Sequence, residues 1–192
     1  MQSRSQWSES LYRIGGGLGF ALGPERARVL VTAAHCLPRE HVAAGAIADA
    51  RPRYDGLVAS LAAPHERAAA ACVFADWVGD IAALQIAEHA SLAPASAFQL
   101  GRAGPEGRAL PVWLPSLNGA WFRCDVRVTG PLLWLTNAAC DLVGGMSGAP
   151  IVAADGSAIG ILCACDASKR GGGPNPSLWG NLPAWLLDRL IA

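Results

Sequence analysis

Short runs of apolar residues, several of them alternating with polar or small residues, recur along the chain and predict β-strands. Glycine, proline and aspartate separate these runs, as they do in turns between strands. The alanine-rich stretch 62–71 also suggests a helix, but Pro64 and the strand pattern on either side weaken that interpretation. We expect strands at 11–14, 17–22, 29–32, 57–61, 69–74, 81–86, 110–114, 121–128, 132–136, 151–153 and 159–164.

The end of the chain follows a helical period instead. Apolar residues recur there at spacings of three and four, with Asn181 in a position to cap the helix and Pro183 in its first turn. A short closing helix is therefore expected over about 182–191. The segment 171–176 has the composition of a flexible linker, and we interpret it as a loop inside the domain because an apolar segment follows it.

The strands divide into two halves of roughly six. The segment 88–109, rich in glycine and proline with mostly small or polar neighbours, is interpreted as the crossing between them. We therefore expect an all-β fold of two six-stranded antiparallel β-barrels with a cleft between them and a short C-terminal α-helix. The whole chain, 1–192, forms a single domain in this interpretation, with sub-barrels at about 1–95 and 108–180.

Composition excludes several classes of function. The 15 basic residues balance the 15 acidic ones, so nothing favours a nucleic acid or an anionic membrane as partner. No stretch reaches the roughly 18 consecutive apolar residues of a membrane helix. The first ten residues are polar and lack the apolar core of a secretory signal, so we expect a cytoplasmic protein.

The six cysteines are expected as free thiols rather than as a disulfide framework. Cys163 and Cys165 lie two residues apart in an apolar run, and a bridge between them would close a strained ring. Zinc is not expected either, because no Cys-x-x-Cys pair occurs and the histidines 41, 65 and 89 lack ligand-like spacing. We expect neither a metal nor a cofactor.

A candidate nucleophile lies in the sequence GMSGAP at 145–150. A serine hydroxyl needs a base to take its proton and donors to hold the oxyanion that forms. Glycines on both sides of Ser147 permit a tight turn, and the N–H groups of Gly145 and Ser147 are the natural donors. The structural alternative is a Gly-Ser turn between two strands.

Two further segments supply a base and an acid. The apolar strand before TAAHC at 32–36 ends in small residues that leave room for the ring of His35. In GDIAAL at 79–84, Asp80 stands at the head of a strand, where it can orient an imidazole. Asp76 competes for the role of the acid, but we expect it to be a solvated loop residue.

Together the three segments resemble the signature blocks of the chymotrypsin/trypsin-like serine peptidase family, in its short bacterial branch. The resemblance implies peptide-bond hydrolysis by a His35/Asp80/Ser147 triad, with an oxyanion hole at Gly145 and Ser147 and a protein or peptide as substrate. Activation by zymogen cleavage is not expected. Ile14 lies too close to His35 for it, and Met146 replaces the aspartate that such zymogens use.

The resemblance also places the substrate pocket. Asp141 would lie at its base and select Arg or Lys, or else be a surface-loop residue, which would leave a small or medium apolar preference. Cys163, Ala164 and Cys165 would form one wall and pair with the substrate backbone.

Two classes of function remain open at this point. One is an active intracellular endopeptidase, serving as the protease module of a bacterial signalling or defence system with a sensor or regulatory partner. The other is a silent scaffold of the same fold that binds peptides without cutting them. Intact triad residues favour the first, and esterase activity is a weaker third alternative.

Overall fold

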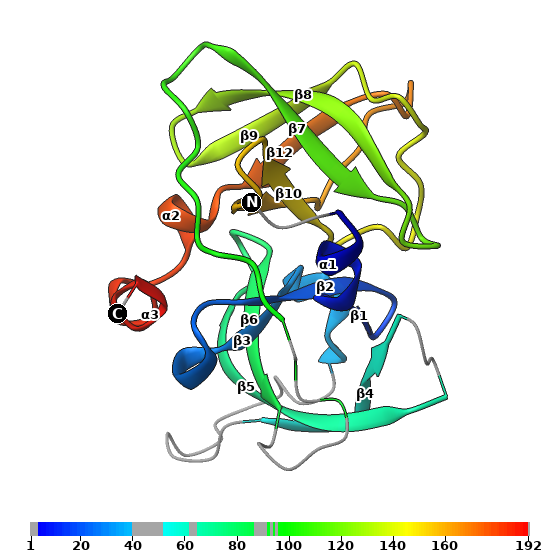
Figure 1. Cartoon of the computed structure of the whole chain (residues 1–192), viewed down its shortest axis with the longest axis vertical. Helices are drawn as coiled ribbons and strands as arrows, with labels where there is room; N and C mark the ends of the chain where they lie inside the picture. Colours follow the sequence, from blue (N-terminus) through cyan, green and yellow to red (C-terminus); the bar gives the residue numbers. More distant parts are fainter. Residues whose placement is uncertain are drawn as a thin grey trace.

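The first half of the chain forms a closed six-stranded barrel of antiparallel strands, in the order β1-β2-β3-β6-β5-β4 (Figure 1). In the first six residues of β5, buried residues alternate with exposed or half-buried ones, as expected when one face of a sheet lines a barrel interior. Closure pairs every strand on both sides, which removes exposed sheet edges. The strands are β1 (Leu11–Ile14), β2 (Gly17–Leu22), β3 (Val29–Thr32), β4 (Arg53–Ser60), β5 (Arg67–Asp76) and β6 (Ile81–Ile86).

The second half forms a curled six-stranded sheet in the order β11-β10-β7-β8-β9-β12. Its ends approach each other at the bridge between Gly160 and Ser177, so this half is a curled half-barrel, consistent with the expected double-barrel architecture. The strands are β7 (Ala109–Pro115), β8 (Trp121–Thr129), β9 (Leu132–Thr136), β10 (Pro150–Ala153), β11 (Ala158–Ile161) and β12 (Gly172–Pro176). The prediction of an all-β fold with two six-stranded β-barrels is confirmed, the second in the form of a half-barrel.

The computed structural model describes residues 4–39, 52–61, 65–86, 92, 94 and 96–191 of the 192, without the side chains of 4–6. Part of the predicted crossing, together with the histidines at 41 and 89, lies outside the described residues. The described part of the crossing pairs with both halves in turn. Phe98 bridges Leu22 of the barrel, and Leu100 bridges Ala158 of the second sheet.

Strand β12 replaces the loop predicted at 171–176. Its glycines serve close packing rather than flexibility, because a Cβ on Gly172 would lie only 2.5 Å from the Cα of Cys165. Gly172 also has a φ of +138°, which disfavours a side chain. Strand β11 ends at Ile161, three residues earlier than predicted.

Three helices and two 3₁₀ turns complete the described part of the chain. α1 (Arg4–Glu9) was not predicted, and η1 (Glu25–Ala27) and η2 (Ala34–Cys36) flank β3. The closing helix is confirmed as α3 (Ala184–Ile191), preceded by the short α2 (Leu178–Asn181). Asn181 does not cap α3 as predicted. It is the last residue of α2, whose N-cap is Ser177.

Aromatic side chains join the two halves. α1 lies between them in Figure 1, and its Trp7 ring lies 5.0 Å from that of Trp121 on β8. Phe98 from the crossing contacts Phe20 of β2 with ring centroids 5.8 Å apart. This buried cluster spans both halves, so it holds them together. No helix in the described part of the chain is long and apolar enough to span a membrane.

Candidate active site

His35 lies in η2, the 3₁₀ turn that directly follows strand β3. The N–H groups of Cys36 and Leu37 close this turn on the carbonyls of Ala33 and Ala34. Both alanines are fully buried, so only a small side chain fits beneath the ring. The rigid turn projects the imidazole outward, where its side chain is 42% exposed.

Asp80 holds His35 at two points. Its Oδ2 lies 2.7 Å from the ring Nδ1, and its Oδ1 accepts the backbone N–H of His35 at 3.0 Å. A carboxylate at Nδ1 fixes the proton on that nitrogen and leaves Nε2 as an acceptor. Asp80 has a φ of 53°, an uncommon conformation that aspartate and asparagine tolerate better than most residues.

Asp76 shapes the turn that carries Asp80. Its Oδ1 accepts the N–H groups of Val78 and Gly79 at 2.9 and 3.0 Å. This corrects the expectation that Asp76 is merely a solvated loop residue, although it does not compete for His35 either. An aspartate that accepts N–H groups two and three residues ahead is a recognisable turn signal, and the sequence analysis missed it.

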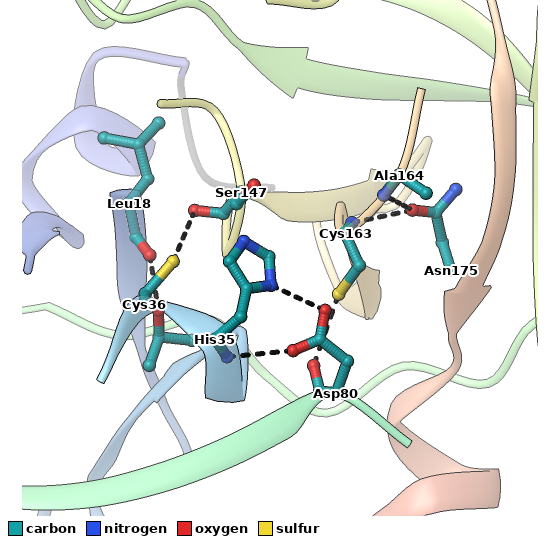
Figure 2. A network of polar contacts seen from close by, with 9 residues as sticks. Leu18, His35, Cys36, Asp80, Ser147, Cys163, Ala164 and Asn175 are labelled. Atoms are coloured by element: carbon teal, nitrogen blue, oxygen red, sulfur yellow. Dashed lines mark hydrogen bonds and ion pairs between the residues drawn. The ribbon is translucent and has the colours of Figure 1, made fainter. Parts of the chain in front are cut away.

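Ser147 lies in a tight loop between β9 and β10. Gly145 and Gly148 have φ values of 88° and 83°, which explains why glycine flanks the serine. Figure 2 shows the ring of His35 between Asp80 and Ser147. Neither the N–H of Gly145 nor that of Ser147 donates to an acceptor among the described residues, so both remain available to a bound group.

The Ser147 loop rests on the first barrel. Its carbonyl accepts the N–H of Leu18 at 2.7 Å, and the thiol of Cys36 contacts the same oxygen at 3.7 Å. A Cβ on Gly148 would clash with the Leu18 carbonyl oxygen. The nucleophile candidate from the second half is therefore fixed against β2 and the His35 turn from the first.

Cys163, in the second half of the chain, contacts the backbone of Asp80 in the first half. Its thiol donates to the Asp80 carbonyl at 3.3 Å, and burial raises the pKa of that thiol strongly. The N–H groups of Cys163 and Ala164 both donate to Oδ1 of the buried Asn175 (Figure 2). Sequence reasoning missed Asn175, because its glycine- and proline-rich neighbourhood indicates a loop.

Asp141 is already paired. Its Oδ1 lies 3.0 Å from Nε of Arg170, and the two side chains are 52% and 53% exposed. Arg170 also donates to the Ala138 carbonyl at 3.1 Å, so the pair ties two loops together. This geometry favours the surface-loop alternative for Asp141 over the base of a pocket.

All six cysteines are free, with Cys36, Cys72 and Cys124 buried. Among the described residues, no group of three or more histidine, cysteine or acidic side chains could hold a metal ion. The groups gathered around Ser147 are its own hydroxyl, the imidazole of His35 and the carboxylate of Asp80.

Comparisons with known proteins agree with this geometry. A family model described as a trypsin-like peptidase domain matches residues 17–161. The Rv3671c protease of M. tuberculosis in its active form has 18% identity and a TM-score of 0.62, with 98% of this chain and 83% of that chain covered. An inactive form carrying a serine-to-alanine mutation has 18% identity, a TM-score of 0.56 and coverage of 97% and 87%. At this identity the likeness shows the fold alone. A search of curated protein sequences found no significant match.

Proposed function

The chain belongs to the trypsin-like peptidase family, and from this premise we propose that it is a serine endopeptidase with His35, Asp80 and Ser147 as its catalytic triad. The observation that carries the proposal is the two-point contact of Asp80 with the ring and backbone of His35. That contact fixes both the tautomer and the orientation of the base, which a merely structural pair does not require.

The proposed reaction begins with proton transfer from Ser147 Oγ to His35 Nε2 as the oxygen attacks the substrate carbonyl. The imidazolium that forms is stabilised by Asp80, and it then protonates the leaving amine, so the C–N bond breaks and an acyl-enzyme remains. Water attacks the ester in the second half of the cycle, with His35 again as base. The free acid leaves, and Ser147 regains its proton.

Charge on the substrate oxygen is stabilised in the proposed oxyanion hole. The N–H groups of Gly145 and Ser147 belong to a loop whose conformation depends on the positive φ values of Gly145 and Gly148. Donors fixed in advance stabilise a developing charge without reorganisation, and removing one such donor typically costs about 3 kcal/mol. A scaffold that only binds peptides would not need two N–H groups without an acceptor among the described residues next to an oriented histidine.

Control of the peptidase is part of the proposal. Ile14 is fully buried and paired with Gly17 in the β1–β2 hairpin, so it does not resemble a terminus released by cleavage. We propose regulation by a sensor or partner protein in a bacterial signalling or defence system instead. Co-purification of the catalytically dead Ser147→Ala protein from its host tests for such a partner.

The proposed activity is tested with a peptide library analysed by mass spectrometry. Wild type should cut, Ser147→Ala should not, and Ser157→Ala should match wild type, since its hydroxyl only closes the turn at Asp155. Cleavage by Ser147→Ala would exclude the mechanism, whereas no cleavage by wild type would favour the peptide-binding scaffold.

The same library addresses the substrate pocket, for which we propose a wall at Cys163, Ala164 and Cys165. A preference for Arg or Lys that Asp141→Ser abolishes would establish Asp141 as the selecting residue. A small or medium apolar preference, unaltered in Asp141→Ser, is what the Asp141–Arg170 pair favours.

A further inference from the structure

Asn175 is the most completely engaged buried side chain near the proposed active site. It has no exposed surface, and its carboxamide uses every hydrogen-bonding position. Oδ1 accepts the N–H groups of Cys163 and Ala164 at 2.7 and 3.0 Å. Nδ2 donates to the carbonyls of Leu133 and Gly172 at 3.3 and 3.1 Å. Two donors and a two-fold acceptor are required at this point, which among side chains of this size only asparagine supplies.

This contact explains where β11 ends. Successive N–H groups of an extended strand point to opposite sides. The N–H groups of Cys163 and Ala164 instead converge on one oxygen, so the chain must leave the strand conformation there. Asn175 thus accepts the two N–H groups, those of Cys163 and Ala164, that have no backbone acceptor among the described residues, and it sets the course of the chain there.

The opposite side of the segment is left open. The Cys165 N–H and the carbonyls of Cys163 and Cys165 form no hydrogen bond with any described residue. Cys165 is exposed, and the thiol of Cys163 contacts the Asp80 carbonyl. An extended peptide that adds to this edge would therefore lie beside Asp80 and Ser147.

We propose that Asn175 is a positioning residue that aligns the edge 163–165 for the residues of a peptide substrate preceding the cut. This inference rests on the proposed function. Asn175 touches neither the substrate nor the triad. Its loss should raise KM for long peptides and leave the reaction at Ser147 nearly unchanged.

The test compares two substrates that have the same residue before the cut. That residue is the one that wild type prefers in the peptide library. One is a single-residue ester, and the other is a tetrapeptide amide that reaches the edge. For Asn175→Ala, kcat/KM on the tetrapeptide should fall about 30-fold, mainly through KM, as expected for the loss of about two hydrogen bonds. On the ester, it should fall less than about threefold.

The matched control is Ser177→Ala, which removes another buried polar group on the same connection. Ser177 caps α2 by accepting the Gly180 N–H and forms no hydrogen bond with Cys163 or Ala164 among the described residues, so replacing it with alanine should affect both substrates equally. Hydrogen exchange adds a second readout, because the amides of Cys163 and Ala164 should exchange faster in Asn175→Ala and not in Ser177→Ala. Asn175→Ser, whose hydroxyl is too short to replace the carboxamide, serves if the alanine variant does not fold.

Equal losses on both substrates in the Asn175 variants, or unchanged exchange at residues 163 and 164, would overturn the positioning role. The proposed function would stand in that case. A wild-type protein that cleaves neither substrate would instead reject the proposed function itself.

Discussion

Single glycines determine how closely the Ser147 loop approaches the first barrel. Gly17 lies where the Ser147 carbonyl accepts the neighbouring Leu18 N–H, and a Cβ on Gly17 would collide with that carbonyl and lie 2.5 Å from Cys36 Sγ. A Cβ added to the adjacent Gly16 would have no other atom within 4 Å. Two neighbouring glycines thus differ sharply in what they permit.

We predict that Gly17→Ala lowers kcat/KM about 100-fold, because the Ser147 loop must shift away from His35 and misplacement near 1 Å has that cost. The free energy of unfolding should also fall, by about 1–3 kcal/mol, as for other overpacked sites. Gly16→Ala is the control and should match wild type in both measurements. Equal behaviour of the two variants would show that the contact between the loop and β2 does not position Ser147.

The residues that motifs could reveal are His35, Asp80 and Ser147, because the proposed chemistry constrains their immediate neighbours in sequence. The structure places His35 and Asp80 in contact, with Ser147 beside the ring. Asn175 was not predictable in the same way. The N–H groups that its Oδ1 accepts lie 11 and 12 residues earlier, and the backbone path that needs this acceptor is visible only in three dimensions.

At the scale of elements, the turn from β5 to β6 sets the position of the acid. Asp76 closes this turn with two hydrogen bonds, and Asp80 leaves it with a positive φ. Val78, at its tip, is 98% exposed. The side chain of Asp76 therefore organises this turn, whereas that of Val78 extends into solvent.

Asp76→Ala should lower kcat about tenfold, since the N–H groups of Val78 and Gly79 lose their acceptor and Asp80 is less firmly placed. Asp76→Asn retains the acceptor oxygen and should recover most of the activity. Val78→Ser should behave as wild type. Steady-state kinetics on one peptide substrate measures all three variants, and an Asp76→Ala protein as active as wild type would refute this role of the turn.

Strand periodicity located most elements, because apolar alternation reflects burial on one face of a sheet. Strand β8 was predicted within one residue, and β9 at its observed bounds. β12 was missed because its buried residues are a glycine, an asparagine and a proline, Gly172, Asn175 and Pro176, which give no apolar alternation in the sequence. The N-terminal helix α1 is held in place by the contact of Trp7 with Trp121, which is distant in sequence. No local sequence pattern predicts this helix.

At the scale of the whole molecule, buried thiols link stability to pH. Burial raises the pKa of Cys36 to about 11 and that of Cys124 to about 12, from an ordinary value of 9.0. Above pH 9 the unfolded chain therefore releases these protons while the folded protein retains them. Stability from this source is fully present below pH 9, falls as the pH rises, and levels off near pH 12.

The alkaline loss should be smaller in Cys124→Ala. Between pH 9 and 11 this variant should lose about 2 kcal/mol less unfolding free energy than wild type, because the unfolded thiol is already half ionised at pH 9. The exposed Cys140→Ala is the control and should follow the wild-type curve. Urea unfolding across this pH range provides the measurement, and identical curves for both variants would contradict the assigned burial effect.

If Asp80 orients His35 and His35 activates Ser147, the rate at which a fluorophosphonate labels Ser147 should depend on both residues. Asparagine tolerates the φ of 53° at position 80 and can still accept the His35 N–H. Its Nδ2 would donate to Nδ1, however, so the ring proton would move to Nε2 and block the base.

We predict one adduct in wild type, on the peptide that contains Ser147, and none there in Ser147→Ala. Asp80→Asn should remain folded and label about 10⁴-fold more slowly. Failure of wild type to label, an adduct on another serine, or undiminished labelling of Asp80→Asn would contradict the account.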